Sequence, residues 1–154
     1  MAREITGGCR CGQLRYRFGQ DGPLLNYCCH CLDCQKSTAS AFADQLIVST
    51  DALTLTGRSV IYSTERPSGG TTNNQHCPDC FSRVCNANTV YPAMTIVRAG
   101  TLDDPSELEP FAHIWVKRKR GWIMVADGVP TFDESPDPME FMRFITEITE
   151  RGGA

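Results

Sequence analysis

Nine cysteines constrain this chain of 154 residues more than any other feature of its sequence. Seven of them fall into three closely spaced groups: Cys9 and Cys11 in GGCRCG, Cys29, Cys31 and Cys34 in CCHCLDCQK, and Cys77 and Cys80 in HCPDC. An odd total suits a closed set of disulfides poorly, and the N-terminus MAREITGG has no apolar run typical of a secretory signal. We therefore predict a cytoplasmic protein, in which clustered cysteines bind metal or act in catalysis.

The first and third groups together supply four thiolates, enough for a closed zinc site. Zn²⁺ favours four ligands in a tetrahedron, and a C-x2-C turn offers two thiolates from one place in the chain. Pro78 and Asp79, which separate the third pair, suit such a tight turn. We predict a structural zinc that links the first strand to a segment far along the chain, with these ligands: Cys9, Cys11, Cys77 and Cys80.

The middle group supplies three thiolates and lacks an obvious fourth. Three protein ligands with one open position are typical of a catalytic zinc, so we predict a second, open zinc site at Cys29, Cys31 and Cys34. Two alternatives remain. A second structural zinc would take its fourth ligand from Cys28, His30 or His76. A C-x-x-C redox pair would require a thioredoxin-like βαβ context, which this sequence does not show.

Other polar or reactive side chains are expected to have less specific roles. His30 lies between two predicted ligands, and we interpret it as a supporting or surface residue rather than a ligand. Cys85 is expected to be a small buried hydrophobe. His113 is expected to be a histidine of the core or of a pocket rim. The basic run KRKR at 117–120 is expected to be a solvated turn or strand end rather than a phosphate-binding patch.

Short alternating segments predict a mainly β fold. In QLRYRF, Leu14, Tyr16 and Phe18 fall on one face, the period of a half-buried strand. Further strands are predicted by the same reasoning or by their bounding turn residues at 41–49, 52–57, 59–64, 93–102 and 111–119. The segments 66–74 and 103–110 are rich in Gly, Pro, Asn and Asp and are predicted to be loops.

A single clear helix is predicted near the C-terminus, at about 137–150. Asp137 is the expected N-cap, followed by Pro138 at the first helical position and Glu140 three residues after the cap. Its apolar stripe, expected to pack onto the β-core, consists of Phe141, Phe144, Ile145 and Ile148. A short helical turn is also expected through LDCQKS after Cys31. The whole chain, 1–154, is predicted to be one domain.

Composition argues against several classes of partner. The net charge of −3 gives no reason to expect nucleic acid. No window approaches the ~18 consecutive apolar residues of a membrane-spanning helix. The sequence predicts no oligomeric state.

The order of the motifs resembles the glutathione-dependent formaldehyde-activating enzyme family, which includes the centromere-protein-V-like proteins. The resemblance runs from residue 5 to about residue 130, through GGCRCGQLRY, CCHCLDCQKS, HCPDC and RAGTLDDPSELEPFAHIWV to Trp122. It implies a β-tent of coiled antiparallel sheets stapled by zinc. It also implies two zinc ions per chain, a closed one at Cys9, Cys11, Cys77 and Cys80 and an open one at Cys29, Cys31 and Cys34.

The family's reference activity joins glutathione and formaldehyde into S-(hydroxymethyl)glutathione, a carbon–sulfur lyase reaction. The resemblance therefore implies a small thiol such as glutathione as substrate. We expect the cleft for this thiol to be lined by His113, Trp115 and Phe81. Two positions depart from the family. Phe81 stands where a glycine usually follows the C-x2-C turn, and His76 stands where an aromatic residue often precedes it. The alternative function is a non-enzymatic binding module with two structural zinc sites.

Overall fold

The computed structural model describes residues 2–151 and divides into two compact units. The first unit comprises Met1–Asp21 and Leu46–Glu107, and the second comprises Gly22–Gln45 and Leu108–Ala154. The strand β4 (Ala43–Ser49) runs through the boundary between them. The prediction of one domain over 1–154 stays a prediction, and its extreme ends, Met1 and 152–154, lie outside the described residues.

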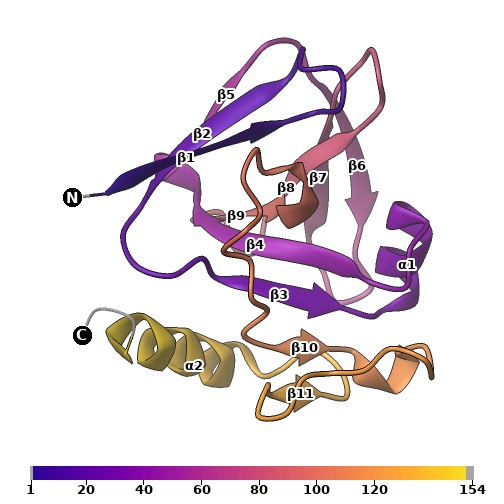
Figure 1. The fold of residues 1–154 in the computed structure, drawn as a ribbon. Helices are drawn as coiled ribbons and strands as arrows, with labels where there is room; N and C mark the ends of the chain where they lie inside the picture. Colours follow the sequence, from indigo (N-terminus) through magenta and orange to yellow (C-terminus); the bar gives the residue numbers. More distant parts are fainter. Residues whose placement is uncertain (1, 152–154) are drawn as a thin grey trace. The chain divides into compact units, whose positions relative to one another are not determined.

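The first unit is built from β-strands (Figure 1). Three of them form an antiparallel sheet in the order β1-β2-β5, and four others pair antiparallel in the order β6-β7-β8-β9. The strands are β1 (Arg3–Gly8), β2 (Arg15–Gln20), β5 (Thr54–Thr56), β6 (Val60–Glu65), β7 (Thr71–His76), β8 (Arg83–Asn88) and β9 (Met94–Arg98). Short 3-10 turns lie at η1 (Thr50–Ala52) and η2 (Ala99–Thr101).

The alternation predicted for β2 is confirmed by burial. Leu14, Tyr16 and Phe18 are 0%, 2% and 2% exposed, so their side chains form part of the core. The Tyr16 hydroxyl hydrogen-bonds with Thr101 Oγ1 at 2.8 Å, which joins β2 to the turn η2. Gly7 on β1 faces this tyrosine, and a Cβ there would lie 2.2 Å from the hydroxyl oxygen. Only glycine permits this close approach.

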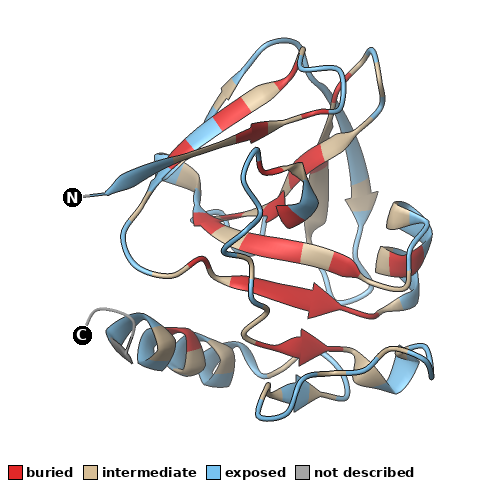
Figure 2. Cartoon of the chain, viewed as in Figure 1, coloured by how far each residue is buried: buried red, intermediate tan, exposed pale blue. Residues whose placement is uncertain are grey.

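The second unit combines short parallel strands with both α-helices. Its elements are β3 (Asn26–Cys29), α1 (Leu32–Thr38), β10 (His113–Ile114), η3 (Val116–Arg118), β11 (Thr131–Phe132) and α2 (Pro138–Arg151). The strand β10 pairs in parallel with both β3 and β11. All four residues of β3 are buried, so this strand lies in the core of the unit (Figure 2). The strand that carries Cys29 is therefore rigidly packed.

The C-terminal helix α2 begins where its capping signal predicts. Asp137 Oδ1 accepts hydrogen bonds from the backbone N–H groups of Met139 and Glu140 at 2.9 and 3.1 Å. The apolar stripe packs through Phe141, whose ring centroid lies 5.8 Å from Tyr27 of β3 and 5.6 Å from Phe111. Over residues 2–151, neither helix has the length and apolar character needed to cross a bilayer.

Most predicted strands are confirmed, although several are shorter than predicted. The segment 93–102 forms β9 only as far as Arg98 and then the turn η2, and 52–57 forms the three residues of β5. The predicted strand 111–119 is only two residues long, because Trp115 adopts a left-handed conformation (φ 59°) that ends β10 and begins η3. The predicted short helix after Cys31 is confirmed as α1.

One loop prediction is wrong in part. The segment 66–74 contains the first four residues of β7, which starts at Thr71. The sequence TTNNQH has no apolar alternation to reveal a strand. Its backbone is instead held by antiparallel neighbours on both sides, β6 and β8, and Asn74 Nδ2 donates to Tyr62 O across the β6 pair. The other predicted loop, 103–110, contains no helix or strand.

Candidate metal centres

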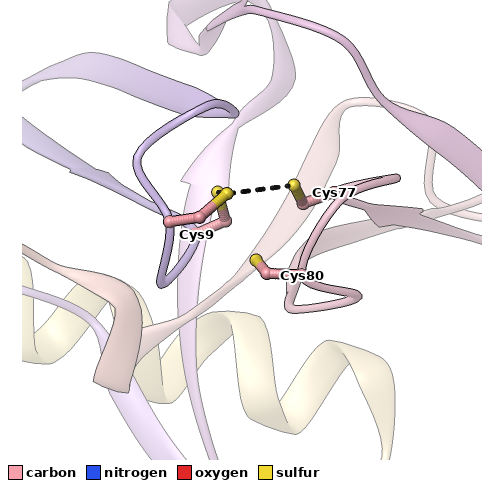
Figure 3. A group of neighbouring side chains, drawn as sticks. Cys9, Cys77 and Cys80 are labelled. Carbon is pink, nitrogen blue, oxygen red and sulfur yellow. Dashed lines mark hydrogen bonds between the residues drawn. The ribbon is translucent and has the colours of Figure 1, made fainter.

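Four cysteine sulfurs of the first unit converge on one point. The Sγ atoms of Cys9, Cys11, Cys77 and Cys80 all lie within 4.8 Å of one another. The Cys9–Cys11 and Cys11–Cys77 sulfurs are 3.5 and 3.7 Å apart. A tetrahedral zinc with Zn–S bonds of about 2.3 Å requires sulfur separations of about 3.8 Å. Figure 3 shows how two loops bring the labelled sulfurs together. The group thus fits a closed zinc site, as its spacing predicted.

Local hydrogen bonds favour ionisation of two of these cysteines, Cys9 and Cys80. The Leu14 N–H donates to Cys9 Sγ at 3.2 Å, and the turn is closed by Cys9 N–H donating to Leu14 O at 2.9 Å. Burial opposes ionisation of Cys9, but the Leu14 N–H and the neighbouring thiols outweigh it and lower its pKa. Hydrogen bonds from the Ser82 hydroxyl and backbone lower the pKa of Cys80 to about 5. Both effects favour the thiolate, the form that binds metal.

The turn that presents Cys77 and Cys80 contains the departure noted at Phe81. Phe81 N–H donates to Cys77 O at 3.0 Å, and the backbone at Phe81 is left-handed, with φ 58°. This conformation costs a residue with a Cβ roughly 1–2 kcal/mol and costs glycine almost nothing. The phenyl ring is 74% exposed, so its packing offsets little of that cost. The position has the geometry of a glycine site occupied by phenylalanine.

The second group lies entirely within one short stretch of the second unit. The Sγ atoms of Cys29, Cys31 and Cys34 lie within 4.8 Å of one another. Cys29 ends β3, Cys31 is the N-cap of α1, and Cys34 follows in the first helical turn. The Cys34 N–H donates to Cys31 Sγ at 3.3 Å, so the sulfur of Cys31 takes the place of a capping oxygen.

This second group has three members among the residues that the structure describes. No histidine, cysteine, aspartate or glutamate in residues 2–151 brings a fourth ligand atom within the same distance. The fourth ligands considered for a structural site, Cys28, His30 and His76, all lie outside the group. Three thiolates suit zinc or another soft or borderline divalent ion. The group therefore fits a metal bound through three protein ligands.

The electrostatics of the three-cysteine group favour a thiolate. Hydrogen bonds from Cys29 and Cys34, with help from the N–H groups of Cys34 and Asp33, lower the pKa of Cys31 to about 2. The hydrogen bonds of Cys29 with Cys31 and Cys34, which favour the thiolate at Cys31, raise the pKa of Cys29. The Gln45 amide adds a weak contact, with Nε2 3.8 Å from Cys34 Sγ. A divalent cation would replace the shared protons and allow all three sulfurs to ionise.

The two remaining cysteines, Cys28 and Cys85, belong to neither group. Cys28 and Cys85 are each 2% exposed, and burial raises the pKa of each to about 12. All nine cysteines are free thiols in the structure. The burial of Cys85 agrees with its interpretation as a small hydrophobe. His76 lies on β7, with Nδ1 3.2 Å from Asn74 O.

The sequence did not reveal one feature beside the second group, a buried pair of histidines. His30 is 0% exposed, so the surface position considered for it is wrong. Its Nε2 lies 2.8 Å from Nδ1 of His113, which is itself 7% exposed. These residues are 83 positions apart, and no local pattern signals their contact. The parallel pairing of His113 with Cys28 brings them together.

The fold and these sites define a mainly β protein with two cysteine clusters suited to metal. Residues 4–118 match the family described as "Glutathione-dependent formaldehyde-activating enzyme", and the chain belongs to this family. A crystal structure of a Rhodobacter sphaeroides protein, determined by structural genomics, shares 16% identity and covers 68% of this chain and 91% of its own, with a TM-score of 0.49. That likeness is too low to support an argument about function. Comparison with curated proteins gives no match.

Proposed function

We propose that this protein is a zinc-dependent enzyme of the carbon–sulfur lyase type. It would join a small thiol such as glutathione to a small aldehyde such as formaldehyde. Membership of the glutathione-dependent formaldehyde-activating family supports this class of activity. The observation that carries the proposal is the contrast between a group of four cysteines and a group of three, measured by the same distance. A metal held by the group of three would have a fourth position free for a substrate sulfur.

The chemistry requires a thiolate and an aldehyde, and no redox partner. A metal at Cys29, Cys31 and Cys34 would keep a coordinated substrate thiol deprotonated. The substrate sulfur then forms a bond to the carbonyl carbon, and the π electron pair of the carbonyl moves to oxygen. That oxygen takes up the proton lost by the thiol, which gives the hydroxymethyl thioether. Atoms and electrons balance without a further reactant.

The protein's own contribution is to hold the three sulfurs in place. Cys29 is fixed by the buried strand β3, and Cys31 is fixed by its capping role in α1. The Gln35 side chain donates to His30 O at 2.7 Å and to Arg118 O at 2.9 Å, which ties the cysteine loop to the turn η3. Such fixed ligands reduce the entropy lost when substrate binds.

The turn η3 also gives the second unit a cationic surface. The exposed side chains of Arg118 and Arg120 lie within the run 117–120. Burial is the main cause that lowers the pKa of His30 and His113, and the charge of Lys119 adds to it, so Lys119 lies near the cysteine loop. Glutathione is an anion with two carboxylates, and these cations are suited to attract it. The expectation that Trp115 and Phe81 line its cleft stays a prediction.

The proposal is tested by the rate at which glutathione and formaldehyde exchange with their adduct. Exchange NMR at equilibrium measures this rate directly, because the uncatalysed reaction reaches the same equilibrium. We expect zinc-loaded protein to accelerate the exchange and Cys34→Ser to abolish the acceleration. Cys85→Ala, which lies outside both groups, should retain it. A protein that binds two zinc ions yet accelerates nothing and binds no thiol would favour the non-enzymatic binding module.

A further inference from the structure

The residue between two ligands of the three-cysteine group is held at both of its backbone polar groups. His30 N–H donates to Ile114 O at 3.0 Å. His30 O accepts from Gln35 Nε2 at 2.7 Å. His30 therefore fixes the path of the chain from Cys29 to Cys31. A shift of this residue would move two of the three sulfurs.

The side chain of His30 is held by a contact with His113. Nε2 of His30 lies 2.8 Å from Nδ1 of His113, and the two ring planes are inclined by 22° with centroids 5.1 Å apart. Phe42 covers the assembly, with its ring centroid 5.3 Å from that of His30. The other nitrogen of His30, Nδ1, is buried and has no hydrogen-bond partner. Within residues 2–151, the contact to His113 is thus the one polar contact of this ring.

The contact joins one ring nitrogen of each histidine, so one nitrogen donates and the other accepts. The ring of His30 has no alternative partner in its surroundings, so its orientation depends on His113.

We propose that His113 is a positioning residue for the three-cysteine metal group. Its Nδ1 fixes the imidazole of His30, and the position of His30 fixes how the chain presents the sulfurs of Cys29 and Cys31. This inference rests on the proposed metal site. It assigns to two histidines a role that is neither ligation nor proton transfer. His113 acts on the metal only through the residue between two ligands.

The test exploits the different reach of Asn and Gln side chains. An Asn amide places a polar atom close to the position of histidine Nδ1, and a Gln amide places one close to Nε2. At position 113 the contact uses Nδ1, so His113→Asn should retain it and His113→Gln should lose it. At position 30 the contact uses Nε2, so His30→Gln should retain it and His30→Asn should lose it. A role in packing alone would show no such crossed pattern.

Cobalt-loaded protein provides the readout, because the ligand field of Co²⁺ reports the geometry of the sulfurs around it. The Cys34→Ser variant supplies the spectrum of the four-cysteine group, which is subtracted to isolate the three-cysteine group. In His113→Gln and His30→Asn we expect an altered second-site spectrum and about tenfold weaker binding of the second cobalt by chelator competition. The first-site spectrum should stay unchanged, and His113→Asn and His30→Gln should resemble the wild type.

The outcomes separate this inference from the metal site on which it rests. If the wild type binds two cobalt ions and all four variants keep its second-site spectrum and affinity, the positioning role is overturned and the site stands. Equal losses in all four variants would also overturn it, since they would indicate packing alone. A wild type that binds one cobalt ion, with a spectrum that Cys34→Ser leaves unchanged, would overturn the metal site and the inference together.

Discussion

The two cysteine groups offer the same kind of metal ligand in different structural settings. The four-cysteine group joins separate segments of the first unit, since Cys11 and Cys77 lie 66 residues apart. The three-cysteine group comes from one stretch of the second unit, where β3 and α1 already fix the chain. Metal bound to the first group would close a long loop and contribute directly to folding. Metal bound to the second would close almost no loop, so little of its binding energy would stabilise the fold.

The largest expected effect on stability, which tests the contrast between the two groups, comes from removing a ligand of the four-cysteine group. We expect Cys77→Ser to lose one zinc and more than about 4 kcal/mol of stability, because the lost metal holds distant segments together. Chemical denaturation and elemental analysis would measure both changes. Cys85→Ala is the matched control, since it alters a cysteine that is also 2% exposed or less but belongs to neither group. A zinc-loaded Cys77→Ser variant with wild-type stability would remove the contrast.

The matching change in the three-cysteine group should cost much less. Serine is a good N-cap, so Cys31→Ser should lose the second metal and thiol binding while its hydroxyl still caps α1. Cys31→Ala should lose the cap as well and be less stable than the serine variant by about 1 kcal/mol. Thermal unfolding and metal analysis of the two variants measure these effects. A loss in Cys31→Ser as large as that in Cys77→Ser would make both groups structural.

A smaller effect, of opposite sign, is expected at the turn of the four-cysteine group. Phe81→Gly should raise stability by about 1 kcal/mol, because glycine adopts the left-handed backbone at this position without strain. Phe81→Ala keeps the strain and removes only the exposed ring, so it should change stability little. Comparing the two variants by denaturant titration isolates the backbone term. If the glycine variant proves no more stable than the alanine variant, the strain is relieved elsewhere in the turn.

The sequence predicted most where local pattern and local structure coincide. The period of β2, the Asp137 cap of α2 and the C-x2-C turn each depend on neighbouring residues. The strand β7 escaped prediction because its stability comes from two partner strands rather than from apolar alternation. The early end of β10 follows from a left-handed residue, Trp115, whose type gives no sign of that conformation.

In the candidate site, too, features that depend on nearby residues could be predicted and features that depend on distant ones could not. The two cysteine groups could be assigned from spacing, because thiolates that share a metal recur at short intervals in the chain. The number of ligands in the second group could not be settled in that way, since Cys28, His30 and His76 all had suitable donors. The buried contact between His30 and His113 depends on the pairing of β3 with β10, which no local pattern encodes.

The central claim is that a metal held by the three-cysteine group would bind the sulfur of the substrate. Titration calorimetry of zinc-loaded protein with glutathione and with S-methylglutathione tests this most directly, because the two ligands share their carboxylates and differ at sulfur. We predict clear binding of glutathione, far weaker binding of the methylated form, and loss of that difference in Cys34→Ser. Equal affinity of the wild type for the two ligands would contradict the account.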